Sequence, residues 1–482
     1  MRDATGMAEL VRTRQISAKE LVEETIEKIE RLNPELNAVT STRYEEALCE
    51  ADRRDFSEKP FAGVPFLLKD LGQEQAGQLS TSGSRLFQTY RAKSSDNYVK
   101  ALENLGFIIL GRTNTPEFGF KNISDSSLHG VVNLPDNQTR NAGGSSGGAA
   151  ATVASGILPL AAASDGGGSI RIPASFNGLV GLKPSRGRIP VGPDSFRGWQ
   201  GASVSFALSQ SVRDCRNLLY HLQTCQIESP FVLPELSYGS LYHVKDREFK
   251  PLRIAVLKDS PIGSEVSEDA RAAVEKAEQF LSDLGHEIVH LSEQPLDGVA
   301  AMQAYYLMNS VETAAMFAGI EQSFGRAMTH EDMEPMTWAI YRSGLSIPAH
   351  LYSQTLALWD QFSHQMAQFH ETYDVLLTPT TADVAPKHGQ FDQPAERVER
   401  LLAMDSLAMA EQQDLIWEMF ADSLALTPFT QQANLTGQPA ISLPIYRRGD
   451  GLAIGVQLTA AKGREDLLLH LAEEFESANQ FR

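Results

Sequence analysis

The sequence predicts an α/β protein that folds as one large domain of 482 residues. Segments with the apolar spacing of helices alternate over short distances with runs typical of strands, which is the pattern of layered α/β proteins. With 42% hydrophobic and 21% charged residues, the composition is that of a globular protein that can bury a large core. No internal repeat and no low-complexity linker interrupts the chain, so we expect a single domain.

The elements follow in order from the N-terminus. Ser17 and Glu20 form a capping box, and the apolar stripe behind them predicts a helix that ends at Asn33-Pro34. A second helix is expected at about 96–104, and it leads into a strand at 107–110. Later elements are expected as strands at 253–257, 287–291, 373–377 and 451–458, and as helices at 268–284 and 465–476.

Two stretches lack this alternation. The Pro- and Gly-rich passage 183–203 is expected to form an irregular loop. Between about 296 and 370 the chain is helix-rich and crowds large side chains together, at Met302, Tyr305, Tyr306, Met308, Met316 and Phe317. A helical core layer is the simpler interpretation of these residues, and the wall of a substrate pocket is the alternative.

Charge and composition exclude several classes of function. The net charge of −19 repels nucleic acid and anionic membranes, and no basic run resembles a nucleic-acid reader. The N-terminus has no apolar core of the signal-peptide type, and the most apolar stretch, 156–163, is too short to span a bilayer. Cys49, Cys215 and Cys225 have neither metal-binding nor disulfide spacing. We therefore expect a cytoplasmic protein without a metal.

The most informative feature is a pair of glycine-rich tracts that contain serine, at 143–148 and 165–169. Neither tract ends in the Gly-Lys of a phosphate-binding P-loop, and the first tract does not follow an apolar strand as a dinucleotide fingerprint would. Gly144-Ser145-Ser146-Gly147-Gly148 satisfies the nucleophile-elbow pattern, but a polar segment precedes it and no histidine stands out as a base. No serine is followed three positions later by lysine, which excludes the penicillin-binding pattern.

Lys69 is the third candidate for chemistry. The five positions before it, 64–68, are apolar or proline, so a strand here would carry the lysine into the interior. Burial lowers the pKa of a lysine and frees its lone pair to act as a base. From this segment alone, a strand-end lysine that reaches solvent is the simpler interpretation.

The combination of these motifs resembles the amidase signature family over nearly the whole chain, most weakly between about 225 and 365. The matching segments are 64–70, 111–118, 143–148, 165–175, 178–184, 374–380 and 434–441. The resemblance implies a single domain over 1–482, with a mixed, twisted β-sheet covered by helices on both faces. It places a signature core at about 60–205 and a substrate-pocket region at about 296–370, and it implies no cofactor.

The same resemblance implies a catalytic set of Ser169, Ser145 and Lys69. Ser169 would be the nucleophile, and Ser145, after a cis peptide bond from Gly144, would bridge it to Lys69. A serine hydroxyl is a poor nucleophile until a base accepts its proton. Neutral Lys69 could accept that proton through Ser145, because a hydroxyl both accepts and donates. The reversed relay would protonate the amine leaving group.

The glycines before Ser169 are candidates for an oxyanion hole. Successive unhindered N–H groups at Gly166, Gly167, Gly168 and Ser169 can form an anion-binding nest. Gly166 departs from the bulkier residue common in the family, which could widen the pocket. Asp165 is expected to brace the loop, with Arg171 either paired to it or facing a substrate carboxylate.

The neighbouring serines are assigned structural roles. Ser146 is expected to cap the helix that begins near Ala149, because serine is a preferred N-cap residue. Ser164 and Ser175 are interpreted as structural.

The resemblance therefore predicts an amidase that hydrolyses the C–N bond of a small linear or cyclic amide to a carboxylate and an amine or ammonia. The segments 61–71 and 182–193 are similar to the branch that contains 6-aminohexanoate cyclic-dimer hydrolase. The alternative within the family is the glutaminase subunit of a tRNA-dependent amidotransferase. The expected partner is a small-molecule amide, and the chain is expected to act as a monomer or homodimer, without nucleic acid or membrane. A non-catalytic binding protein would lack a relay member, and all three are present.

Overall fold

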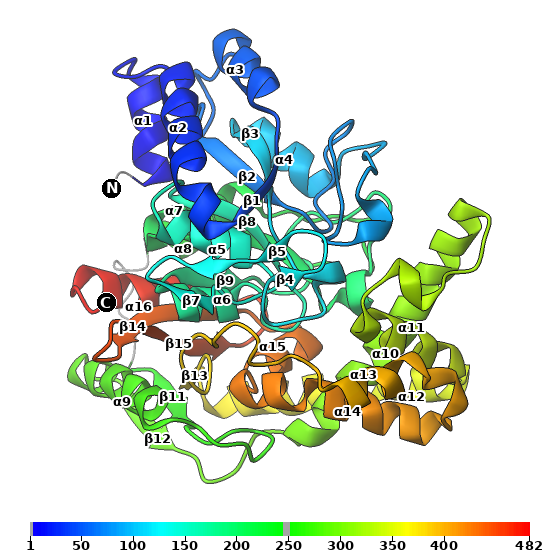
Figure 1. The fold of residues 1–482 in the computed structure, drawn as a ribbon. Coiled ribbons are helices and arrows are strands. Elements are labelled where there is room, and N and C mark those ends of the chain that lie inside the picture. Colours follow the sequence, from blue (N-terminus) through cyan, green and yellow to red (C-terminus); the bar gives the residue numbers. More distant parts are fainter. Residues whose placement is uncertain (1–2, 244–250) are drawn as a thin grey trace.

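The computed structural model describes residues 3–243 and 251–482 and shows an α/β domain with one large sheet and one small sheet (Figure 1). The large sheet is mixed. Strand β11 runs parallel to β12 and β13, and every other pair of neighbouring strands in this sheet is antiparallel. Its strands lie in the order β12 (Glu287–His290), β11 (Arg253–Val256), β13 (Val375–Pro379), β15 (Ala453–Ala460), β14 (Ala440–Arg447), β9 (Val180–Lys183), β10 (Val204–Ser209) and β8 (Leu160–Asp165).

The small sheet has the order β1 (Val39–Thr42), β3 (Ile108–Thr113) and β2 (Pro65–Lys69). Strand β2 is buried along its whole length and runs parallel to β3. The loop after β2 reaches the edge strand β8 of the large sheet, where the Gln73 side-chain amide donates to the Ala163 carbonyl at 3.0 Å. Two short hairpins pair β4 (Asp125–Ser126) with β5 (Gly130–Val131) and β6 (Asn133–Leu134) with β7 (Asn137–Asn141).

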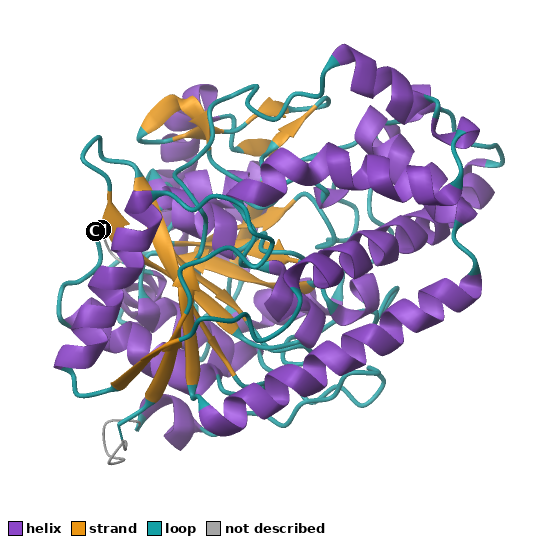
Figure 2. Cartoon of the chain, turned by 90° about the horizontal axis from the view of Figure 1, so that it is seen from below, coloured by secondary structure: helices purple, strands orange, loops and turns teal. Residues whose placement is uncertain are grey.

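Helices cover both faces of the large sheet (Figure 2), which confirms the predicted architecture. In chain order they are α1 (Ala4–Arg12), α2 (Ala18–Leu36), α3 (Tyr44–Arg53), α4 (Asn97–Leu105), α5 (Gly147–Ala154), α6 (Arg171–Asn177), α7 (Val212–Leu222), α8 (Tyr238–Tyr242), α9 (Glu268–Asp283), α10 (Gly298–Phe324), α11 (Pro335–Ser346), α12 (Ala349–Thr372), α13 (Ala395–Leu402), α14 (Met409–Leu426), α15 (Gln431–Thr436) and α16 (Glu465–Ser477).

The predicted end of the first long helix is wrong. The capping box of Ser17 and Glu20 forms as expected, but α2 continues through Pro34 to Leu36. A proline already has the φ of a helical residue, so in the last turn its ring is tolerated at the loss of a backbone hydrogen bond. The helix ends instead where Asn37 takes the left-handed conformation. Helix α1, which precedes α2, was not predicted.

The strand expected at 107–110 is β3, which begins at Ile108 and extends to Thr113. The other predicted strands and helices are present with ends that differ by a few residues. The passage 183–203 is irregular as predicted, apart from a short 3-10 turn at Gly198–Gly201.

The region 296–370 forms α10, α11 and α12, and these helices build a second apolar core beside the sheet (Figure 1). Met302, Tyr305, Tyr306 and Met308 lie in that core, whereas Met316 is exposed. Three of these residues, Met302, Tyr305 and Tyr306, also line a pocket beside Ser169. The core interpretation is therefore confirmed for these four residues, and the wall of a substrate pocket stays a prediction.

Candidate active site

Lys69 lies at the end of β2, where the small sheet meets β8 of the large sheet. Its side chain is fully buried, and Nζ donates hydrogen bonds to Ser145 Oγ at 2.7 Å and to Ser164 Oγ at 3.0 Å. The backbone of Lys69 is held as well, because its N–H donates to Gln73 Oε1 at 2.7 Å and its carbonyl accepts from Arg112 at 2.9 Å. The strand thus holds the lysine in place, and the interpretation that this segment carries Lys69 into the interior is confirmed.

Burial changes the charge state of this lysine. Desolvation lowers the pKa of Lys69 to about 7, and the negative charge of Asp165 partly opposes the shift. Near neutral pH a substantial fraction of Lys69 is therefore uncharged and able to accept a proton.

Ser145 is buried and follows a cis peptide bond from Gly144. A side chain on Gly144 is excluded, since its Cβ would lie 2.6 Å from the backbone of Ile123. The loop that brings Ser145 Oγ to Lys69 Nζ therefore requires glycine at position 144.

The role predicted for Ser146 is only partly correct. Ser146 occupies the N-cap position of α5, but its side chain makes no capping hydrogen bond. Its hydroxyl lies instead against β8, where it donates to the Ser164 carbonyl at 3.2 Å and accepts from the Ser164 N–H at 3.3 Å. These hydrogen bonds between the glycine tract and β8 form in place of the expected capping hydrogen bond.

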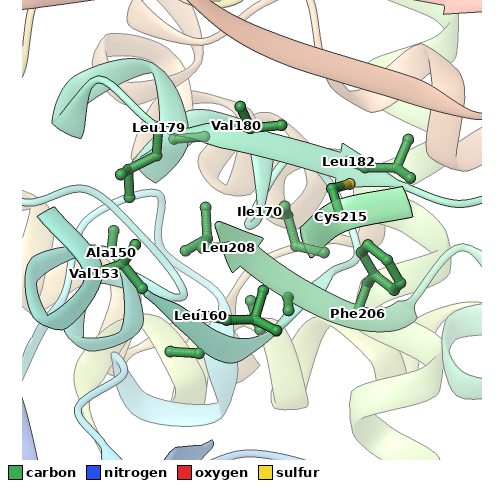
Figure 3. Close-up of a cluster of buried hydrophobic side chains, with 14 of the residues drawn as sticks. Ala150, Val153, Leu160, Ile170, Leu179, Val180, Leu182, Phe206, Leu208 and Cys215 are labelled. Atoms are coloured by element: carbon green, nitrogen blue, oxygen red, sulfur yellow. The ribbon is translucent and has the colours of Figure 1, made fainter. Parts of the chain in front are cut away.

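Ser169 lies two residues before α6 and is half-buried at the wall of a pocket. The next residue, Ile170, is fully buried in a cluster formed by side chains of β8, β9, β10, α5 and α7 (Figure 3). This anchor fixes the backbone of Ser169. Within the described part of the chain, Ser169 Oγ has no hydrogen-bond partner, so the bond from Ser169 to Ser145 that a relay requires is not formed here.

Asp165 and Arg171 form a buried ion pair that holds the glycine loop. Arg171 donates to both carboxylate oxygens of Asp165, at 2.9 and 2.8 Å, and the remaining guanidinium nitrogen bonds Thr430 and Gln457. Asn434 donates to the same carboxylate at 2.9 Å. Arg171 is fully buried and its side chain is committed to these partners, so it does not face a substrate carboxylate.

The carboxylate of Asp165 removes the Gly168 N–H group from the expected oxyanion hole. The Gly168 N–H already donates to Asp165 Oδ1 at 2.7 Å, so it is not free to bind an oxyanion. The carbonyls of Gly166 and Gly167 accept from Tyr305 at 3.0 Å and Thr430 at 2.7 Å. Among the described residues, no acceptor faces the N–H groups of Gly166, Gly167 or Ser169, which remain candidates.

The pocket beside Ser169 has two parts. The inner part, of about 50 Å³, has an aromatic wall in which Trp199 stacks on Phe120 and meets Tyr305 edge-on. A second, wider cavity of about 490 Å³, called the outer part, shares Lys121, Asn122, Phe420 and Ser423 with the inner part, but Ser169 does not line it. No histidine of the described chain lines either part, so the elbow interpretation with a histidine base finds no support.

Several residues of the site were not predicted. Ser164, interpreted as structural, is the second acceptor of Lys69, and Trp199 and Asn434 touch or hold the glycine loop. Tyr305 was predicted only as a possible pocket wall, and it also donates to the Gly166 carbonyl. Asn434 lies in one of the matching segments, which was its only signal in the sequence.

Among the described residues, no group of three or more His, Cys, Asp or Glu side chains is placed to hold a metal ion. In the same part of the chain, no helix is long and apolar enough to cross a membrane.

The α/β fold, with a lysine and two serines carried on a buried strand and two glycine-rich loops, is the arrangement that the resemblance to the amidase signature class implies. A sequence model of the family described as Amidase matches residues 20–469, and the chain therefore belongs to that family.

Relatives and solved structures agree with this membership. The chain is 41% identical to a lipoamidase of Enterococcus faecalis over 98% of its own length, and it spans 63% of that protein. It is 34% identical to a 6-aminohexanoate-cyclic-dimer hydrolase of Paenarthrobacter ureafaciens, over 99% of this chain and 94% of that protein. A solved structure of 6-aminohexanoate cyclic dimer hydrolase complexed with substrate matches with a TM-score of 0.90 at 33% identity, over 99% of this chain and 96% of that chain.

Proposed function

We propose that the chain hydrolyses the C–N bond of a small linear or cyclic amide through an acyl-enzyme on Ser169, with Ser145 and Lys69 as the proton relay. The observation that carries this proposal is the 2.7 Å hydrogen bond between the buried Lys69 Nζ and Ser145 Oγ. It joins a lysine with a pKa of about 7 to a serine on the loop that precedes the nucleophile tract.

The proposed reaction has two halves. In the first, Ser169 Oγ attacks the amide carbon while its proton passes to Ser145, whose own proton passes to neutral Lys69. The C–N bond then breaks as the relay runs backwards and returns a proton to the leaving nitrogen. In the second half, water attacks the ester carbon of the acyl-enzyme and one of its protons passes through the relay to the departing Ser169 oxygen. The carboxylic acid that forms loses its proton to solvent and leaves as the carboxylate.

The developing oxyanion would be held by the free N–H groups before the nucleophile. Gly166, Gly167 and Ser169 are the donors that support this role, because their N–H groups lack another acceptor in the described chain. Asp165 and Arg171 act as positioning residues that keep the loop in place.

The glutaminase alternative has weaker support from the pocket. Glutamine carries an α-carboxylate, which a binding site usually pairs with an arginine or lysine. The charged side chains that line the two pocket parts are Asp125, Glu334 and Asp392 against Lys121 alone.

We further propose that the chain acts in the cytoplasm as a monomer or homodimer on a small-molecule amide, without nucleic acid or membrane.

The test is a panel of amides that includes short aliphatic, aryl and cyclic-dimer amides and glutamine. The wild type is expected to release amine from at least one of them, and Ser169→Ala to lose this activity with an unchanged melting temperature. A serine-reactive phosphonate should label Ser169 in the wild type, which mass spectrometry of the peptide locates. The exposed Ser282→Ala variant is the matched control. Full activity of Ser169→Ala, or hydrolysis of glutamine alone, would overturn the proposal.

A further inference from the structure

Two hydroxyl groups from distant segments hold successive carbonyls of the glycine loop at 165–169. The Tyr305 hydroxyl, on α10, donates to the Gly166 carbonyl at 3.0 Å. The Thr430 hydroxyl, one residue before α15, donates to the Gly167 carbonyl at 2.7 Å. Successive glycines have no side chains that restrict their backbone, so external contacts of this kind set the direction of each peptide group.

The two peptide groups differ in what holds their N–H ends. The second one is held at both ends, because the Gly168 N–H donates to Asp165 Oδ1 at 2.7 Å. The first one, between Gly166 and Gly167, is held at its carbonyl alone. Within the described part of the chain, no acceptor faces the Gly167 N–H, and the Tyr305 hydroxyl is the only donor to the Gly166 carbonyl. Tyr305 thus provides the one hydrogen bond that orients this peptide group.

The direction of the Gly167 N–H follows from peptide geometry. The bond between Gly166 and Gly167 is trans, so its C=O and N–H groups lie in one plane and point in opposite directions. With the carbonyl turned to Tyr305, the N–H points away from that hydroxyl. Gly167 and Ser169 are partly exposed and line the inner part of the pocket, whereas Gly166 is buried and does not. A carbonyl oxygen bound beside Ser169 can therefore reach this N–H.

The surroundings of Tyr305 keep its hydroxyl in place as a donor. The side chain is buried in the second apolar core, and Trp199 meets its ring edge-on with 6.1 Å between the centroids. Burial raises the pKa of Tyr305 above its ordinary value, so the hydroxyl stays protonated at neutral pH. A Cβ on Gly167 would lie 2.5 Å from the hydroxyl oxygen, so glycine at this position leaves the room that the contact needs.

We infer that Tyr305 is a positioning residue of the oxyanion hole, and that its hydroxyl turns the Gly167 N–H toward the carbonyl oxygen of the bound amide. The inference rests on the proposed acyl-enzyme at Ser169. Negative charge develops on that oxygen only as the tetrahedral intermediate forms, so a donor that has turned away slows the reaction more than it weakens binding of the amide. Without the hydroxyl, the peptide group is free to rotate.

The experiment compares Tyr305→Phe with the wild type on the amide of the panel that the wild type hydrolyses fastest. We expect kcat to fall by about 10- to 100-fold, while KM changes by less than about 3-fold. Calorimetry on the Ser169→Ala background measures binding of the intact amide. Adding Tyr305→Phe to this background should leave that binding unchanged.

The aldehyde with the same acyl chain probes the oxyanion directly. Ser169 Oγ adds to the aldehyde carbon, the serine proton passes to the relay, and the carbonyl oxygen becomes the oxyanion of a hemiacetal. The inhibition constant of this aldehyde should rise in Tyr305→Phe by about the factor by which kcat falls.

Two further variants separate positioning from packing. Tyr98→Phe is the matched control, because this buried hydroxyl also donates to a backbone carbonyl, that of Phe206 in β10. It should lower the melting temperature and leave kcat unchanged. Thr430→Val frees the carbonyl of the peptide group that Asp165 still holds at its N–H, so kcat should fall by less than about 3-fold.

Gly167→Ala disturbs the same contact from the loop, because its methyl group displaces the Tyr305 hydroxyl. The double variant with Tyr305→Phe should therefore lose less than the product of the two single losses. Wild-type kcat in Tyr305→Phe would overturn the inference. So would a loss that appears equally in binding of the amide to the Ser169→Ala background, or an equal loss of kcat in Tyr98→Phe.

The outcomes also separate this inference from the proposed function. Full activity of Ser169→Ala would overturn the proposed function, whatever Tyr305→Phe does. If turnover depends on Ser169 but Tyr305→Phe keeps the kcat and the aldehyde affinity of the wild type, the inference alone fails.

Discussion

Trp199 packs directly on Gly166, and a Cβ placed on this glycine would lie 2.8 Å from the indole ring. The indole thus occupies the space of the side chain that is absent at Gly166. The same ring stacks on Phe120, with 6.1 Å between the ring centroids, and forms the aromatic wall of the inner pocket. The departure at Gly166 therefore does not widen the pocket, because a residue from the irregular loop fills the gap.

Gly166→Ala is the first prediction. The new methyl group displaces the indole from the pocket wall, and we expect kcat/KM to fall by about 10-fold or more, as overpacking forces a shift of well-packed neighbours. The double variant with Trp199→Ala should recover part of this loss, which a double-mutant cycle measures. In Gly198→Ala the Cβ would meet only Ser203 at 3.7 Å, so this variant should behave like the wild type. Additive effects in the cycle would contradict the packing argument.

The pH dependence follows from Lys69. The base must be neutral, and the pKa of Lys69 is lowered to about 7, so kcat/KM should rise with pH and level off above this value. Below it, the neutral fraction falls about 10-fold per pH unit. Lys69→Ala should lose most of the rate at neutral pH and less at high pH, where hydroxide takes over. A wild-type profile that stays flat from acid to neutral pH would exclude Lys69 as the base.

Ser164→Ala tests the second acceptor of Lys69. Its hydroxyl accepts from Nζ at 3.0 Å, and such a bond favours the charged lysine. Its removal should lower the pKa of Lys69 further and move the acidic limb of the rate profile to lower pH. We expect a loss in kcat of about 2- to 10-fold with little change in KM, because the lysine also loses a contact that orients it. A profile that superimposes on that of the wild type would rule out this positioning role.

Arg171→Met tests the brace of the glycine loop. The change leaves the fully buried Asp165 without its ion-pair partner, and breaking a buried pair costs about 3–5 kcal/mol of unfolding free energy. Urea unfolding measures this loss. Arg213→Met, which breaks the exposed pair with Asp3, should cost about 1 kcal/mol or less. Similar losses in the two variants would show that the buried pair does not stabilise the loop.

The sequence predicted those features that depend on local pattern. Ser17 and Glu20 identify a helix start because a capping box is formed by residues three positions apart, and it is present. The apolar residues before Lys69 indicate a buried strand, and the serines in glycine-rich tracts carry the resemblance that named the candidate site. The helix end at Pro34 was misplaced, since a proline in a last turn is tolerated and the neighbouring Asn37 determines the stop.

The tertiary structure decided what surrounds these residues. Lys69 and Ser164 are 95 positions apart, and Asn434 bonds Asp165 across 269 positions, so no short pattern encodes either contact. The same holds for the Gly168 N–H, whose hydrogen bond to Asp165 removes it from the predicted oxyanion hole. By itself the sequence determined the fold class, the family and the residues that carry the candidate chemistry. Their hydrogen-bond partners and the pocket wall were decided by the packing of the two sheets and the helical layer, because burial and hydrogen bonding depend on which distant segments meet.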